Sequence, residues 1–472
     1  MLGRSGLRPQ QAVPGRPVPA PVTPRARGRG RSLVARVLGF AEAEGRYKKQ
    51  PSRLVRRAYQ QYAAKTSNFP ESLLSPGAGQ STWSGSASER RVFADGFWEN
   101  FTKQLSAEVV ETEPAGKAVD RLYSLVQQLP GVKVSRAHKG GSYGRGTMVA
   151  GNFDVDLLIF VLELDGRALT LEDWLNDPRV GNELRRRVRE ALQARAPEWK
   201  AQISETGHYR YAMRLTLGEM EVKVDLLLLP DVAKGPNNWV RRQHDVLVKS
   251  VYGNPGGVRH SVLRGRADSW AFTEFVRGQD PNVRLAARAL KAWRDGLDAG
   301  AVPNCGIGSV ALEVLVLAAH QELQSQGPKG SDRVYQVRLF VEALRLLVAA
   351  VEGGRVVTVD AGDWGPPHSI LRHRHCWVSE EGEDPVKIIH PIDPTCNVAH
   401  QRRDKPTAKW QAVAVEAKAL LAEFEDGTLR DVLAMLTPAI LLQRSLVQDV
   451  RERMLGPRAP GGDFMNDILF GL

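Results

Sequence analysis

Two aspartates, Asp154 and Asp156, stand two residues apart at the start of an apolar run, Val155–Leu164. Because residues two apart on a strand point to the same face of a sheet, the two carboxylates project side by side. Carboxylates that close repel each other unless a cation lies between them, and all-oxygen ligands suit Mg²⁺. An Asp-x-Asp pair alone is more often solvated, so its meaning depends on what surrounds it.

A glycine-rich loop, KGGSYGRGT at 139–147, comes just before this pair. Gly140 and Gly141 place small residues where the backbone must approach something closely. Exposed backbone amides and the Ser142 hydroxyl can donate hydrogen bonds to phosphate oxygens. A Gly-Gly-Ser triplet alone is an ordinary turn in most proteins, but beside an aspartate pair it becomes a candidate phosphate-binding loop.

A third carboxylate, Asp225, lies within residues 220–229. Every second residue from Met220 to Leu228 is apolar, and Asp225 lies on the opposite face. After Asp225 the run is apolar on both faces. A lone charge at the head of a buried strand needs a partner. A metal ion shared with Asp154 and Asp156 would supply that partner, so the sequence predicts a site of three carboxylates.

The elements that must position these groups follow from periodicity. Apolar spacing predicts helix within 89–128, and Val155–Leu164 predicts a buried strand. Residues 209–217 and 219–229 predict two further strands joined as a hairpin. Beyond about residue 261 the pattern is helical, with helices expected at 283–297, 309–323, 334–351 and 410–424. The sequence therefore predicts an α+β fold with a helical second half.

Charge is concentrated at one end of the chain of 472 residues, whose net charge is +12. The first 60 residues hold 14 basic and two acidic side chains, so the rest is formally neutral. Residues 1–85 are expected to form a disordered basic arm rich in Arg, Pro and Gly. This arm could attract nucleic acid, act as an organellar transit peptide, or be a solvated linker.

Three cysteines, Cys305, Cys376 and Cys396, are too few for a disulfide framework and predict a reducing, cytoplasmic compartment. No apolar run reaches the roughly 20 residues of a membrane span, so no membrane association is expected. His373, His375, Cys376 and nearby residues include zinc-ligand types, but Cys376 has no neighbouring cysteine, so zinc is not expected.

The combination of KGGSYGRGT with Asp154-Val155-Asp156 resembles the 2′-5′ oligoadenylate synthetase family of the polymerase-beta-type nucleotidyltransferase superfamily, to which cyclic GMP–AMP synthase is related. The family's loop has the form KGGSSGKGT and precedes an Asp-Ala-Asp strand. Three later stretches agree in order and spacing: LKAW at 290–293, ALEVL at 311–315 and IDPTCN at 392–397. The resemblance covers residues from about 93 to about 424.

The resemblance implies a two-lobed polymerase-beta-like core, with a catalytic domain at 86–255 and a helical C-terminal domain at 256–472. It implies that two Mg²⁺ ions are held by Asp154 and Asp156, with Asp225 a ligand of the one that activates the attacking ribose hydroxyl. Ser142, with the backbone amides around Gly141, would bind the triphosphate of ATP. Lys291 would bind its outer phosphates, and Ser309 would contact the nucleotide. The chain departs from the family at Tyr143, Arg145, Val310, His390 and Cys396, and the change to Val310 leaves base preference open.

The activity implied is Mg²⁺-dependent synthesis of 2′-5′-linked oligoadenylates from ATP, with release of pyrophosphate, by a monomer serving as a second-messenger enzyme of innate immunity. Double-stranded RNA would be the activator. A cyclic dinucleotide synthase, an enzyme adding nucleotides to RNA ends and a non-catalytic RNA-binding scaffold remain alternatives. Basic runs that could contact RNA phosphates are Arg53, Arg56 and Arg57, and Arg185, Arg186 and Arg187.

Overall fold

The computed structural model describes much of the chain between residues 98 and 439. The described residues are 98–106, 109–151, 155–195, 204–209, 212–217, 222–233, 235, 237–252, 269–325, 332–365, 370–379, 382–399, 409–425, 431–432, 435–436 and 439. The predicted arm 1–85, with Arg53, Arg56 and Arg57, lies outside this part of the chain, and so does Asp154.

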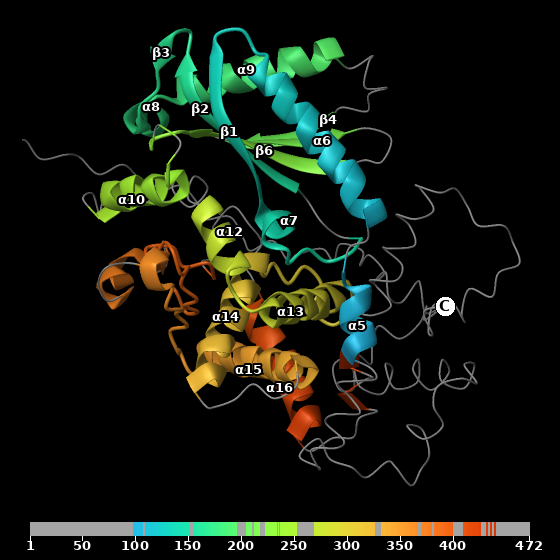
Figure 1. The fold of residues 1–472 in the computed structure, drawn as a ribbon. Helices are drawn as coiled ribbons and strands as arrows, with labels where there is room; N and C mark the ends of the chain where they lie inside the picture. The colour runs from blue at the N-terminus through green and yellow to red at the C-terminus, as the bar shows by residue number, and fades with distance from the viewer. Residues whose placement is uncertain are drawn as a thin grey trace, which may run out of the picture.

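One lobe is built on a six-stranded sheet (Figure 1). The strand order is β1-β2-β6-β5-β4, with the short β3 paired to β2. Only β2 and β6 run parallel, and the other pairs of this sheet are antiparallel. The strands are β1 (Val132–Gly140), β2 (Val155–Leu164), β3 (Arg167–Ala168), β4 (Ser204–Tyr209), β5 (Ala212–Leu217) and β6 (Val222–Pro230).

Strand β2 lies inside the sheet, between β1 and β6, because its residues are apolar on both faces, and Leu157 to Val161 are all buried. The helices α6 (Val109–Gln127) and α9 (Pro178–Arg195) share one hydrophobic core with the sheet. The short helix α8 (Leu171–Asn176) begins with a capping box, in which the Thr170 hydroxyl and the Asp173 carboxylate each accept from the other's backbone N–H.

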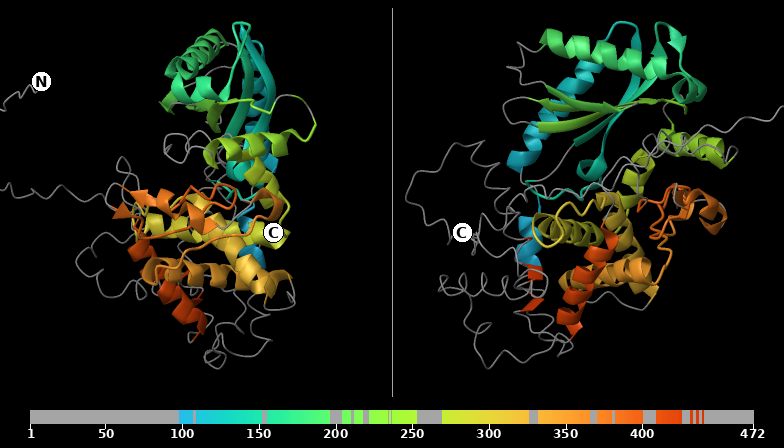
Figure 2. Two further views of the ribbon diagram at one scale, coloured as in Figure 1. Left: turned by 90° about the vertical axis from the view of Figure 1, so that its left-hand side faces the viewer. Right: turned by 180° about the vertical axis from the view of Figure 1, so that it is seen from behind.

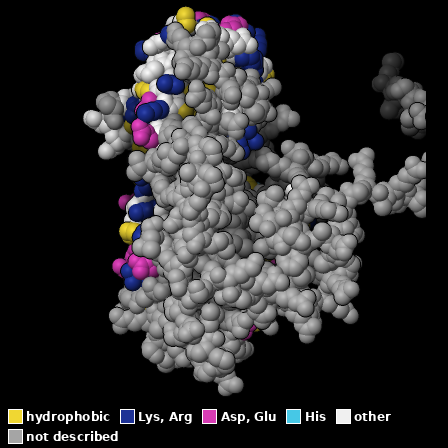
Figure 3. Space-filling model, turned by 90° about the vertical axis from the view of Figure 1, so that its right-hand side faces the viewer, with side chains coloured by type: hydrophobic (Ala, Val, Ile, Leu, Met, Phe, Trp, Pro, Cys, Tyr) yellow, Lys and Arg dark blue, Asp and Glu magenta, His cyan; other side chains and the backbone are white. Residues whose placement is uncertain are grey.

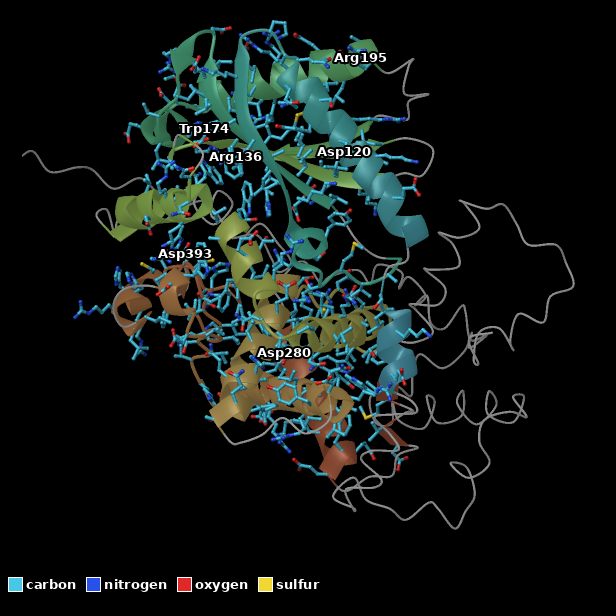
Figure 4. The ribbon with its side chains drawn as sticks, viewed as in Figure 1. Asp120, Arg136, Trp174, Arg195, Asp280 and Asp393 are labelled. Atoms are coloured by element: carbon cyan, nitrogen blue, oxygen red, sulfur yellow. The ribbon has the colours of Figure 1, made fainter. Side chains whose placement is uncertain are left out.

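The second lobe is helical and lies below the sheet in Figure 1. Its large core holds α5 (Glu99–Gln104), α13 (Pro281–Ala299), α14 (Ser309–Ser325), α15 (Asp332–Glu352) and α16 (Trp410–Glu425). Asp280 caps α13 by accepting from the N–H of Asn282, and Pro281 follows at the first turn. Asp280 and Asp393 lie in this lobe, whereas Arg136 lies in the sheet (Figure 4).

Two helices connect the lobes: α10 (Trp239–Tyr252) and α12 (Ser269–Arg277), which lie between the sheet and the helical lobe in all three ribbon views (Figures 1 and 2). Helix α12 packs on β1 and on α7 (Gly141–Arg145), the short helix that follows β1. Beyond the core helices, the helical lobe carries the 3-10 segments η2 (Gly362–Trp364) and η3 (Ile370–Cys376) and the small strands β7 (Val378–Ser379) and β8 (Gly382–Glu383).

The α+β prediction with a helical second half is confirmed. The helical character expected within 89–128 is confirmed for its described residues, which form two helices with different partners. Helix α5 joins the helical lobe, where the indole N–H of Trp98 donates to Gln336 at 3.1 Å, while α6 packs on the sheet. The strand expected at 209–217 is β5, which pairs with β6 as the expected hairpin, and the strand β4 that pairs with its other edge was not predicted. Within the described residues, no helix is long and apolar enough to cross a membrane.

Candidate active site

The glycine-rich loop turns directly over the strand that carries Asp156. Gly140, the last residue of β1, lies opposite Asp156 on β2. Gly141 has φ +61°, a conformation that favours glycine. A Cβ atom at Gly141 would lie 1.7 Å from Oδ2 of Asp156, so a side chain here would force the carboxylate or the loop to shift. The backbone of the loop therefore touches the carboxylate, and Ser142 follows at the start of α7.

Asp156 and Asp225 lie side by side. They are directly paired residues of the parallel strands β2 and β6, and neighbouring strands are about 4.8 Å apart. Paired residues point to the same face of a sheet, so both carboxylates lie on one face beneath the glycine-rich loop. The structure thus brings together Asp156, Asp225 and Gly141, while Asp154 lies outside the described residues.

Asp225 is held by an arginine on the neighbouring strand. Arg214 of β5 lies opposite Asp225 in the antiparallel register with β6. Its Nε donates to Oδ1 of Asp225 at 2.9 Å and its terminal nitrogen donates to Oδ2 at 3.2 Å, so the contact is bidentate. The Asp225 side chain is 12% exposed and that of Arg214 is 52% exposed. Arg214 is a site residue that was not predicted from the sequence.

The donor atoms fit a magnesium site. Among the described residues no three His, Cys, Asp or Glu side chains gather as a metal-binding group, and Asp154 precedes the described strand by one residue. The two carboxylates that the structure does describe are adjacent, share a face and offer only oxygen, the ligand that Mg²⁺ prefers. The close approach of the Gly141 backbone leaves the loop beside these oxygens, so Asp156 and Asp225 are the described residues that would hold Mg²⁺.

Lys291 lies in a buried ionic network rather than on an exposed helix face. Its Nζ donates to Glu313 at 2.5 Å and to the carbonyl and hydroxyl oxygens of Thr147 at 3.0 Å each. Arg145 of α7 donates to the same carboxylate through Nε at 2.8 Å, and the Thr147 hydroxyl also donates to it. Glu313 therefore joins the glycine-rich loop to α13 and α14. Phosphate binding by Lys291 stays a prediction.

Burial and charge oppose each other in this network. Burial lowers the pKa of Lys291, and the neighbouring Glu313 offsets only part of that effect. Burial would raise the pKa of Glu313, but the Arg145 and Lys291 cations and the hydrogen bonds lower it to about 2. Glu313 is thus an anion held by two cations. The sequence carried a signal for it, because Glu313 alone interrupts the apolar run 310–319.

Ser309 and Val310 begin α14. A terminal nitrogen of Arg294 lies 3.5 Å from the Ser309 hydroxyl, and Arg294 also forms an ion pair with Asp295 at 2.6 Å. Val310 packs on the core of the helical lobe. The roles predicted for Gly141, Ser142 and Ser309 in binding a nucleotide stay predictions.

An aromatic stack supports the strands beside the carboxylates. His138 stacks on Trp270 with ring centroids 4.2 Å apart, and Trp270 and Phe160 both contact Trp239. Arg136 lies over the Trp239 ring at 4.2 Å. Burial, together with the Arg277 and Arg145 cations, lowers the pKa of His138 to about 3, so this ring is neutral at ordinary pH. These residues buttress the end of β1 that leads into the glycine-rich loop.

The arginines predicted to bind RNA on α9 are engaged within the protein. Arg186 forms ion pairs with Glu183 and Glu190, and Arg187 forms ion pairs with Asp165 and Glu183. Arg185 is buried and donates to Asn182. Figure 3 shows basic and acidic side chains interspersed on the described surface of the sheet lobe. This arrangement leaves less free positive charge on α9 than the sequence suggests, and RNA binding there stays a prediction.

Comparison with known proteins supports the resemblance found in the motifs. No family model matches the chain. Over 374 residues it is 24% identical to mouse (Mus musculus) 2′-5′-oligoadenylate synthase 3, covering 75% of this chain and 30% of the mouse protein. Over 311 residues it is 25% identical to rat (Rattus norvegicus) 2′-5′-oligoadenylate synthase 1A, covering 61% of this chain and 76% of the rat protein. The similarity to this family is weak but consistent, and the resemblance is confirmed at that level.

Solved structures of two further proteins also match most of this chain. CdnC of E. coli MS115-1 in complex with HORMA-deltaN is 14% identical, with a TM-score of 0.44 and coverage of 77% of this chain and 97% of the other. Cid1 in complex with its short product ApU is 14% identical, with a TM-score of 0.44 and coverage of 73% and 98%.

Proposed function

We propose that this protein is an Mg²⁺-dependent nucleotidyltransferase that joins nucleotides from ATP and releases pyrophosphate. The observation that carries the proposal is the direct pairing of Asp156 with Asp225 under the backbone of Gly141. An acidic pair on one sheet face beside a loop of small residues can serve a metal and a triphosphate together. The similarity to 2′-5′-oligoadenylate synthases supports the same class of reaction.

Each group has a role in this proposal. Asp154, Asp156 and Asp225 hold two Mg²⁺ ions, and bound Mg²⁺ would favour ionisation of the attacking hydroxyl and shield charge on the phosphates. The loop amides near Gly141 and the Ser142 hydroxyl bind the triphosphate. The Glu313 network fixes the end of the loop at Thr147, because Lys291 binds the Thr147 carbonyl and Glu313 its hydroxyl. Ser309 contacts the nucleotide from the helical lobe.

The linkage and the activator are finer parts of the proposal. We infer 2′-5′-linked oligoadenylates as the product and double-stranded RNA as the activator, on the strength of the motifs shared with 2′-5′-oligoadenylate synthases. The test is incubation of the full chain with ATP and Mg²⁺, with and without double-stranded RNA, followed by mass analysis and digestion with nucleases specific for 3′-5′ linkages. RNA-dependent oligomers that resist digestion are expected.

Other results would redirect the proposal. A cyclic product would identify a cyclic dinucleotide synthase. Oligomers formed equally well without RNA would show that double-stranded RNA is not an activator. RNA binding with no ATP turnover under either condition would favour the non-catalytic scaffold and contradict the proposed activity. The salt dependence of RNA binding separates phosphate contacts from non-ionic ones. Each phosphate that the protein neutralises makes the binding constant fall more steeply with salt concentration.

A further inference from the structure

The guanidinium of Arg214 donates hydrogen bonds to both carboxylate oxygens of Asp225, with N···O distances of 2.9 and 3.2 Å. The two residues are opposite each other across β5 and β6, so their side chains lie on one face of the sheet. Asp225 is in turn opposite Asp156 on β2. Arg214, Asp225 and Asp156 therefore form a row across three adjacent strands, with a cation at one end of an acidic pair.

A divalent ion bound to Asp225 and Asp156 would share this row with Arg214. Two cations bound to one carboxylate repel each other, and the repulsion is strongest where the site is partly shielded from water. The carboxylate has lone pairs beyond those that the guanidinium uses, but both of its oxygens are already engaged. Arg214 must therefore share the carboxylate with the ion or leave it.

The exposure of the two side chains shows which one can move. Asp225 sits on a buried strand between paired neighbours and its side chain is only 12% exposed, whereas half of the Arg214 side chain, 52%, is exposed. A long, half-exposed arginine can swing into solvent at small cost, because its charge keeps its hydration there. The short aspartate side chain on its strand cannot leave the row.

We propose that Arg214 is a positioning residue that acts as a built-in counter-cation of Asp225 and weakens the binding of divalent ions to the acidic pair. This inference rests on the proposed function, because it assumes that the acidic pair is the metal site. Arg214 orients the carboxylate towards the shared face and sets the concentration of metal at which the site fills. Metal affinity, and not the fold, is the property that it controls.

The test measures binding of Mn²⁺, as a paramagnetic probe, to the full chain in the presence of a non-hydrolysable ATP analogue. Free Mn²⁺ is followed by electron paramagnetic resonance, so turnover is not needed. Arg214→Gln is expected to tighten Mn²⁺ binding about tenfold, the size expected for removing one unit charge close to the ion at a partly exposed site. Arg214→Lys keeps the charge but loses the bidentate contact and should fall between the two.

Arg186→Gln is the matched control, because that side chain is 51% exposed and pairs with two glutamates on α9, remote from the acidic pair in sequence. It should bind Mn²⁺ like the unaltered chain. Mn²⁺ binding by Arg214→Gln that is equal to or weaker than that of the unaltered chain would overturn the inference. Circular dichroism of each variant identifies any loss of fold. If Arg214→Gln does not fold, Arg214→Lys decides, and Mn²⁺ binding by it no tighter than that of the unaltered chain overturns the inference.

A further variant separates this inference from the proposed function. If Asp225→Asn loses Mn²⁺ binding while Arg214→Gln leaves it unchanged, only the role of Arg214 is overturned. If Asp225→Asn binds Mn²⁺ as tightly as the unaltered chain, the acidic pair is not the metal site, and both the inference and the proposed function fail. The double variant Arg214→Gln with Asp225→Asn should lose the tenfold gain.

Discussion

The carboxylate of Glu313 and the ammonium of Lys291 form an ion pair with a separation of 2.5 Å, and their side chains are only 1% and 3% exposed. The same carboxylate accepts from Arg145, which comes from the glycine-rich loop. One buried anion therefore holds two cations from different lobes. A change at Glu313 should therefore alter both the stability of the fold and the position of the glycine-rich loop.

Glu313→Gln should destabilise the protein by about 3–5 kcal/mol, because it leaves the Lys291 and Arg145 cations buried without their counter-charge. The free energy of unfolding, from urea titration followed by circular dichroism, measures the effect. Glu322→Gln is the control, since Glu322 forms a partly exposed ion pair with Arg355 and should change stability by less than about 1 kcal/mol. Equal effects of the two changes would contradict a central role for Glu313.

The pH dependence of stability should differ between the unaltered chain and Glu313→Gln. The pKa of Glu313 is lowered from 4.5 to about 2 by its cationic partners. A carboxyl group with a lowered pKa stabilises the fold fully above its unfolded-state pKa, and this contribution is lost as pH falls through the folded-state value. The difference in unfolding free energy between the two proteins should therefore shrink between about pH 4.5 and pH 2. A difference that stays constant over this window would argue against an ionised Glu313.

Gly141→Ala should lower the turnover of ATP at least about 100-fold, because displacing reacting groups by about 1 Å has effects of this size. The added methyl group would overlap Oδ2 of Asp156 and force the loop away from the carboxylate. Gly166→Ala is a close control: Gly166 also has positive φ, at +75°, but nothing lies within 4 Å of the place that its added methyl group would take. Steady-state kinetics of both variants separate backbone strain from the clash at the site. Similar losses in both would show that strain alone is responsible.

The sequence predicted the elements whose pattern is local. The strand Val155–Leu164 has the expected bounds, since its continuous apolar run permits little else. Helix α13 was predicted two residues short at each end, and at its start this is because the capping residue Asp280 and Pro281 were not used as a signal. Strand β1 was missed, because its sequence, VKVSRAHKG, mixes polar and apolar residues without a regular alternation and most of its residues are only half-buried.

The part of the candidate site that could be predicted from the sequence is the part carried by local motifs, the glycine-rich loop and the strands that carry the aspartates. The pairing of Asp156 with Asp225 follows from motif order and strand character, and it was anticipated as a convergence of carboxylates. The partners of Lys291 and Asp225 were not, because they depend on packing between lobes and on the register of the β5–β6 hairpin. Arg214 could have been found by placing the hairpin in register, which sets it opposite Asp225.

The most direct test of the central claim is the rate of pyrophosphate release from ATP by Asp225→Asn at saturating Mg²⁺, compared with Asp245→Asn. Asp245 is a partly exposed residue of α10 paired with Arg241, so its change should leave the rate within about twofold, as a surface substitution does. Asp225→Asn should lower the rate at least about 100-fold with the fold retained, because a charged oxygen ligand of the metal is lost. A folded Asp225→Asn protein that releases pyrophosphate at the rate of Asp245→Asn would contradict the assignment of this acidic pair as the catalytic centre.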